Sequence, residues 1–195
     1  MLELEEQKKI KEILANDGVI AFVTDTVWGV GCLPESEKAV KKIYDIKHRD
    51  GKKPLILMSY DIYPLLKYVK PLPKEAHKLI KSYFPGALTL VLKKEEQAPN
   101  YITSNLDTVG IRDPEKEVLQ EICKCIDGGV LATTSANISS CPPALTYDEA
   151  VKYIGDEVDY VVKDYGLKSK GTASTVAGVF DDEVKIFRQG DIVIE

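Results

Sequence analysis

The most constraining feature of this sequence is an apolar run that becomes polar within one residue. Residues 19–23 read VIAFV, which is typical of a strand buried on both faces. Thr-Asp-Thr follows at 24–26, and Gly29 and Gly31 come soon after. Ligands of open α/β sheets bind outside the carboxyl ends of strands, and glycine permits a sharp turn or a close approach to a ligand. The stretch therefore predicts either a small-molecule site or a polar strand end closed by a glycine turn.

A second stretch concentrates positive charge in a chain that is acidic overall. Residues 41–53 carry six Lys or Arg against two acids, whereas the formal net charge of the chain is −5. Such a local cluster favours a small anionic ligand over a long polyanion. The alternative is a solvated helix end, because cations stabilise a helix C-terminus.

Length and composition limit the classes of protein to consider. With 195 residues, of which 44% are hydrophobic, the chain is predicted to form a single domain spanning 1–195. No apolar run approaches the ~20 residues of a membrane span. The charged first residues do not resemble a signal peptide, so we expect a cytoplasmic protein without membrane contact. Four cysteines without a Cys-x-x-Cys pair, and only two histidines, argue against a structural zinc site.

The order of periodic segments predicts an α/β protein. Apolar faces at helical spacing and capping residues indicate helices at 2–15, 37–48, 61–69, 74–83, 114–126 and 146–154. Apolar runs indicate strands at 19–26, 54–58, 87–92, 108–112, 130–137, 158–162, 174–180 and 184–190. Residues 93–100 and 163–173 are predicted to be loops, the second one mobile. Strands that alternate with helices and end in a hairpin favour a mixed sheet flanked by helices.

The chemistry is indicated by strand ends rather than by a familiar catalytic motif. The sequence contains no Walker A motif, no three-glycine dinucleotide fingerprint and no G-x-S-x-G elbow. Instead, hydroxyl and amide side chains recur at strand ends, where they suit orientation of a polar ligand. Five cations lie near these ends and could hold phosphate or carboxylate oxygens, namely Lys47, Arg49, Lys53, Arg112 and Arg188. Together these side chains predict a convergent anion pocket.

Several motifs, taken in order, resemble those of a known family. The motifs are TDTVWGVG (24–31), KHRDGKKPL (47–55), PGALTLVL (85–92), TVGIR (108–112), TSANIS (134–139), STV (174–176) and R-x-G at 188–190. Their order and spacing resemble the YrdC/TsaC family of L-threonylcarbamoyladenylate synthases over about residues 8–191. The resemblance implies a twisted, mixed, open sheet flanked by helices, with a concave basic groove. It also implies formation of L-threonylcarbamoyl-AMP and pyrophosphate from L-threonine, bicarbonate or CO2, and ATP.

The resemblance also implies roles for individual residues. Thr26, Arg112 and Ser174 would contact threonine, and the hydroxyl of Thr24 could join them in bonding the substrate hydroxyl. The ATP site would be formed by Arg49, Lys53, Thr108, Ser135, Asn137, Thr146 and Arg188. The predicted catalytic residues are Lys47 and Arg49, since they could neutralise the triphosphate and the charge on departing pyrophosphate. Met58 stands where the family often has histidine.

Cofactors and partners are implied in the same way. A magnesium ion is expected to be held mainly by the ATP phosphates, and no protein metal ligand is predicted. The adenylate would serve a downstream tRNA threonylcarbamoyl transferase complex that modifies adenosine 37, with direct tRNA or RNA contact left open.

Two other classes of protein compete with this interpretation. One is a double-stranded RNA or tRNA-binding module without adenylation activity. The charge of −5 weakens it, since RNA binding depends on many phosphate contacts. The other is a carbamoyl-adenylate enzyme of hydrogenase maturation, which shares a similar domain, but the sequence lacks the zinc-finger and acylphosphatase segments of that enzyme.

Overall fold

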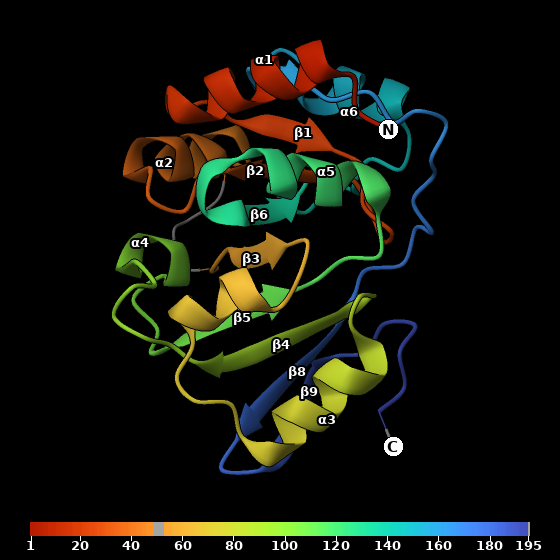
Figure 1. Cartoon of the computed structure of the whole chain (residues 1–195). Helices are drawn as coiled ribbons and strands as arrows, with labels where there is room; N and C mark the ends of the chain where they lie inside the picture. The colour runs from red at the N-terminus through yellow and green to blue at the C-terminus, as the bar shows by residue number, and fades with distance from the viewer. Residues whose placement is uncertain (49–52, 195) are drawn as a thin grey trace.

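The protein is built around one large sheet, which the computed structural model describes for residues 1–48 and 53–194 (Figure 1). Nine strands within these ranges form it, in the order β7-β1-β2-β6-β3-β5-β4-β8-β9. The strands are β1 (Ile20–Phe22), β2 (Gly29–Cys32), β3 (Ile56–Ser59), β4 (Leu88–Lys93), β5 (Thr108–Arg112), β6 (Val130–Ser135), β7 (Tyr160–Val161), β8 (Thr175–Phe180) and β9 (Glu183–Arg188). The helices are α1 (Leu4–Ala15), α2 (Glu37–Ile46), α3 (Lys74–Tyr83), α4 (Asn100–Thr103), α5 (Glu117–Cys125) and α6 (Tyr147–Ile154), with 3-10 helices η1 (Tyr63–Tyr68) and η2 (Asp127–Gly129).

The sheet is mixed, as the sequence predicted. Parallel pairing joins β1 to β7, β3 to β5 and β4 to β8. The other neighbours in the sheet, including the β8–β9 hairpin, run antiparallel. Figure 1 shows α5 and α3 in front of the strands, so these helices cover one face of the sheet. The α/β fold class with an open mixed sheet flanked by helices is therefore confirmed.

The opposite face of the sheet, called the cavity face below, carries the functional side chains. Register places Met58 beside Arg112 and Thr89 beside Val176, which in turn pairs with Arg188. Because side chains alternate between faces along a strand, this row of residues marks one face. The row crosses β3, β5, β4, β8 and β9, so segments far apart in sequence meet on it.

The glycine turn considered for the opening stretch was wrong, whereas Gly29 does line the cavity described below. The first strand ends at Phe22, and Gly29 and Gly31 lie in β2, which pairs antiparallel with β1. A Cβ atom at Gly29 would lie 3.0 Å from Phe22 Cε2, and one at Gly31 would lie 3.0 Å from Phe22 Cε1. The two glycines therefore make room for the Phe22 ring on the neighbouring strand, rather than closing a turn.

Several other elements differ from the predicted ones in type or in length. The helix predicted at 61–69 is the shorter 3-10 helix η1 (Tyr63–Tyr68) rather than an α-helix, and the predicted loop at 93–100 leads into the short helix α4. The strand predicted at 158–162 is reduced to Tyr160–Val161. Ser36 caps the start of α2, since the Ala39 backbone N–H donates to Ser36 Oγ (3.1 Å). No helix in the described parts of the chain is long and apolar enough to cross a membrane.

Candidate active site

A cavity of about 450 Å³ opens on the cavity face. Its described lining contains four cations but no carboxylate side chain. Nine of the predicted site residues line it, namely Thr24, Thr26, Lys47, Lys53, Arg112, Ser135, Asn137, Ser174 and Arg188. The structure thus brings together residues from six segments of the chain that the sequence alone could only suggest were neighbours.

Three predicted residues are not among those that line the cavity. Thr108 shares the cavity face with Arg112 but lies at the opposite end of β5. Thr146 caps α6, where its hydroxyl accepts a hydrogen bond from the Glu149 N–H (3.2 Å). Arg49 lies outside the described residues. Roles in ATP binding for these three residues therefore stay predictions.

Arg112 is the centre of one half of the cavity. Its Nη1 donates to Thr26 Oγ1 (2.9 Å), its Nη2 to Asp25 Oδ1 (2.5 Å) and its Nε to the Gly86 carbonyl (2.9 Å). The Thr24 hydroxyl donates to the Val27 carbonyl (2.6 Å) and lies 3.0 Å from Thr26 Oγ1. These bonds fix the guanidinium and two hydroxyls in one place.

Burial gives the Arg112–Asp25 pair its electrostatic character. The side chains are 2% and 6% exposed, so water hardly screens either charge. Burial lowers the pKa of Arg112, while the Asp25 carboxylate opposes this shift. The bond to Asp25 therefore keeps a charged guanidinium inside the protein, where it can bind an anion in the cavity.

Ser174 links strand β4 to Arg188 of β9 within the cavity. Its hydroxyl lies 2.9 Å from Thr89 Oγ1 and accepts from Arg188 Nη2 (3.1 Å). Arg188 Nε also donates to the Ser174 carbonyl (3.0 Å), and burial lowers the pKa of this arginine. Arg188 is therefore held at the edge of the cavity by the residue that was predicted to contact threonine.

Lys47 is buried rather than solvated. It follows α2 and is 3% exposed, so the solvated helix end is wrong for this residue. Its Nζ donates to the carbonyl oxygens of Ser135 (2.6 Å) and Asn137 (2.8 Å) and to Asn137 Oδ1 (2.8 Å). The Ser135 hydroxyl also donates to Asn137 Oδ1 (2.6 Å). Lys47 thus fixes the loop after β6 in addition to bringing a positive charge to the cavity.

The segment 163–173 contacts the first strand end. Ser169 Oγ donates to the Thr24 carbonyl (2.8 Å), and the N–H groups of Lys170 and Gly171 donate to the carbonyls of Asp25 (3.1 Å) and Thr26 (2.8 Å). This segment runs down the right edge of the view in Figure 1. It therefore supplies hydrogen-bond donors to the backbone carbonyls of residues 24–26, which follow β1.

Sequence reasoning missed two contributors to the site. Thr89 was not singled out, although it is the only hydroxyl in the apolar run 87–92 and bonds Ser174. Asp25 was noted at the strand end but received no role, whereas the structure shows it as the counter-ion of Arg112. A lone polar residue inside an apolar strand was the available signal for Thr89, and a carboxylate next to the predicted cationic pocket was the signal for Asp25.

Asp113 follows Arg112 in the sequence, and one of its carboxylate oxygens lacks a hydrogen bond among the described residues. It is buried, and its Oδ1 has no hydrogen-bond partner among the described residues. Burial, followed by the charges of Asp61 and Asp25, raises the pKa of Asp113 from 3.8 to about 6, although Arg112 and Lys124 oppose this. The folded protein therefore holds this proton more tightly than the unfolded chain.

Asp113 should make the protein less stable as the pH rises from about 4 to 6. In this window the folded state retains a proton that the unfolded state has lost, so stability falls with pH. Asp113→Asn should raise the free energy of unfolding at pH 7 by ~1–3 kcal/mol and change it little below pH 4. Urea denaturation at both pH values tests this, with exposed Asp156→Asn as control. A gain that is equal at both pH values would contradict the assignment.

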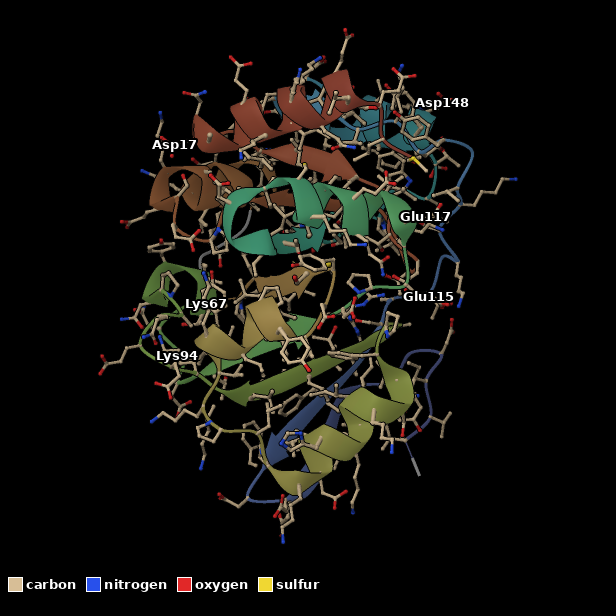
Figure 2. The ribbon with its side chains drawn as sticks, viewed as in Figure 1. Asp17, Lys67, Lys94, Glu115, Glu117 and Asp148 are labelled. Atoms are coloured by element: carbon tan, nitrogen blue, oxygen red, sulfur yellow. The ribbon has the colours of Figure 1, made fainter. Side chains whose placement is uncertain are left out.

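Charged side chains of both signs occupy the rest of the surface. Figure 2 shows the acids Asp17, Glu117 and Asp148 in the upper part of the view, and Lys67 and Lys94 on its left side near mid-height. The chain is acidic as a whole, with a formal net charge of −5. The charged side chains that line the cavity are all cations, so its positive charge is a local feature that suits a small anion.

Comparison with known proteins identifies the family. The family model described as "Telomere recombination", which groups Sua5, YciO and YrdC proteins, matches residues 12–190. A protein of Methanocaldococcus jannaschii is 36% identical over 200 residues, which cover all of this chain and 92% of that protein. A relative named threonylcarbamoyl-AMP synthase from Halorhodospira halophila is 35% identical, over 76% of this chain and 78% of its own.

A solved structure extends the comparison to the fold. Pyrococcus abyssi Sua5 complexed with L-threonine superimposes with a TM-score of 0.91 and 30% identity, over 97% of this chain. This chain covers 55% of that longer protein. On the match of the family model to nearly its whole length, the chain belongs to the Sua5/YciO/YrdC family.

Proposed function

We propose that the chain synthesises L-threonylcarbamoyl-AMP and pyrophosphate from L-threonine, bicarbonate and ATP. The observation that carries this proposal is one cavity that combines a buried, hydrogen-bonded arginine with hydroxyl groups and further cations. Arg112 is bonded to Thr26 in it, and Lys47, Lys53 and Arg188 also line it. The names of relatives such as the Halorhodospira halophila protein support the same reaction.

The Arg112 half suits an amino acid. The guanidinium can bind a carboxylate through N–H groups not used by Asp25, Thr26 and Gly86. The adjacent Thr26 and Ser174 hydroxyls can bond a substrate hydroxyl. Sua5 of Pyrococcus abyssi, which superimposes on this chain, was solved with L-threonine. The remaining cations suit the phosphates of ATP.

The chemistry needs positioning and charge neutralisation more than a protein base. Carbamate formed from threonine and CO2 is already anionic, so its oxygen can attack the α-phosphorus of ATP directly. A new P–O bond forms, the bond to the bridging oxygen of the β-phosphate breaks, and pyrophosphate leaves with the electron pair. Cations around the phosphates stabilise the charge that develops. This role agrees with a cavity lining of Lys, Arg, Ser and Asn without a nucleophilic Cys or His among the described residues.

Magnesium fits only as an ion held mainly by ATP. The described lining offers hydroxyl oxygens and the amide oxygen of Asn137, but no carboxylate. No group of three or more His, Cys, Asp or Glu in the described residues could hold a metal ion. When bound with the nucleotide, magnesium would add to the neutralisation of phosphate charge.

The product points to a downstream reaction. A mixed anhydride of a carbamate and a phosphate is an activated acyl donor, so we expect a transferase complex to pass its threonylcarbamoyl group to adenosine 37 of tRNA. Direct tRNA contact is not required for synthesis of the adenylate.

Pyrophosphate should appear only when threonine and bicarbonate are both present with ATP and magnesium. The reason is that the nucleophile is the carbamate, which needs both components. Nucleotide analysis together with a pyrophosphate assay tests this. Release of ADP and inorganic phosphate, or RNA binding with a steep salt dependence and no adenylate, would overturn the proposed function.

A further inference from the structure

A β-bulge in the last strand places two neighbouring side chains on the same face. Ile186 pairs with Ala177 and Arg188 pairs with Val176, so Phe187 is the extra residue between them. Bulges of this kind re-aim side chains and are frequent beside active sites. Here the bulge brings Arg188, which lines the cavity, directly after an aromatic residue.

The Phe187 ring lies on the cavity face. Gly178 belongs to this face because it follows Val176 by two residues in a regular strand. A Cβ atom at Gly178 would lie 2.7 Å from Phe187 Cε2 and 2.5 Å from Phe180 Cε2. Both rings therefore lean over a glycine that leaves space for them, with centroids 6.5 Å apart.

Packing against Gly178 and Phe180 covers only part of the Phe187 ring. Phe187 is 50% exposed, so half of its surface faces solvent although it lies over the sheet. Lys185 Nζ lies 5.8 Å from the ring centroid, which adds a cation to the same region. An exposed aromatic ring that follows one cation in the strand and precedes a cavity-lining arginine can stack a nucleobase while the cations bind its phosphates.

We propose that Phe187 is the stacking platform for the adenine ring of ATP. The proposal rests on the proposed function, because it assigns the base of the same nucleotide whose phosphates the cavity cations would bind. Adenine is favoured over a base of RNA because Phe187 directly precedes Arg188, which lines a cavity with four cations, in a chain whose formal net charge is −5. Phe187 is then a specificity-determining residue that the sequence motifs did not mark.

The test compares nucleotide affinity with phosphate affinity by isothermal titration calorimetry. Phe187→Ala should weaken ATP binding at least about fivefold, the lower end of base–aromatic stacking. It should leave inorganic tripolyphosphate binding unchanged, and Phe187→Tyr should restore ATP affinity. Ile186→Ala is the matched control, because Ile186 is 41% exposed on the same strand but faces the other side of the sheet.

The outcomes separate this inference from the proposed function. ATP affinity is measured without threonine, so stacking can be confirmed even in a protein that makes no adenylate. Equal ATP affinity of Phe187→Ala and the parent protein would overturn the inference. An equal loss of affinity for ATP and for tripolyphosphate would also overturn it. If Phe187→Ala weakened binding of an oligoadenylate but not of ATP, the ring would be assigned to RNA binding instead.

Discussion

Asp25→Asn should lower the free energy of unfolding by about 3–5 kcal/mol, the cost of breaking a buried ion pair from one side. The Asp25 carboxylate lies 2.5 Å from Arg112 Nη2, and both side chains are almost completely buried. Removing the negative charge leaves a buried guanidinium without the carboxylate that hydrogen-bonds it. Burial already lowers the pKa of Arg112, and Asp25 is the main opposing influence. Urea denaturation at neutral pH measures the loss.

A double variant distinguishes lost charge balance from general disruption. Asp25→Asn with Arg112→Met should recover part of the stability, because neither charge remains buried alone. The exposed pair of Lys11 and Asp127 gives the control, since Asp127→Asn should cost at most ~1 kcal/mol. A loss below 1 kcal/mol for Asp25→Asn, or a double variant no more stable than the single one, would contradict the role of this pair.

The sequence allowed the site residues at strand ends to be predicted, because alternation locates a strand and its carboxyl end is where ligands bind. TVGIR alternates correctly for a strand, and β5 begins and ends at the predicted residues, Thr108–Arg112. The carboxyl end of a buried strand is where ligands bind in such sheets. These rules placed Arg112 and Ser135 at the site without knowledge of the strand order, whereas Thr26 lies there although β1 ends at Phe22.

The remaining features depend on contacts between distant segments. The burial of Lys47 follows from acceptors at Ser135 and Asn137, about ninety residues further along the chain, which no local pattern can reveal. The glycines of β2 were misassigned for a similar reason. Glycine favours turns locally, but Gly29 lies in a strand, where the absence of a side chain leaves space for the Phe22 ring on the neighbouring strand.

The arrangement of hydroxyls sets a direction for hydrogen bonds in the threonine half of the cavity. The Thr24 hydroxyl donates to the Val27 carbonyl, so Thr24 Oγ1 can accept from the Thr26 hydroxyl 3.0 Å away. Thr26 Oγ1 in turn accepts from Arg112 Nη1. With its proton directed to Thr24, Thr26 has one further lone pair available. A ligand hydroxyl that donates to Thr26 therefore completes the chain.

Threonine should be used in preference to valine by a factor on the order of 10⁴ in kcat/KM, as expected of a site built to bond a hydroxyl. Valine has the same shape but cannot donate to Thr26. Serine should be used about 10- to 200-fold less well than threonine, since it lacks only a methyl contact. Adenylate formation with each amino acid measures these ratios.

Thr26→Val tests whether the Thr26 hydroxyl recognises the hydroxyl group of the substrate. The variant keeps the side-chain shape but removes the acceptor for the substrate hydroxyl, so the threonine-to-valine ratio should fall at least about 10²-fold. Thr24→Ser is the matched control, because it retains the hydroxyl that donates to the Val27 carbonyl. A Thr26→Val enzyme that still rejects valine as strongly as the parent protein would place recognition of the hydroxyl at Ser174, whose hydroxyl is held by Thr89 and Arg188.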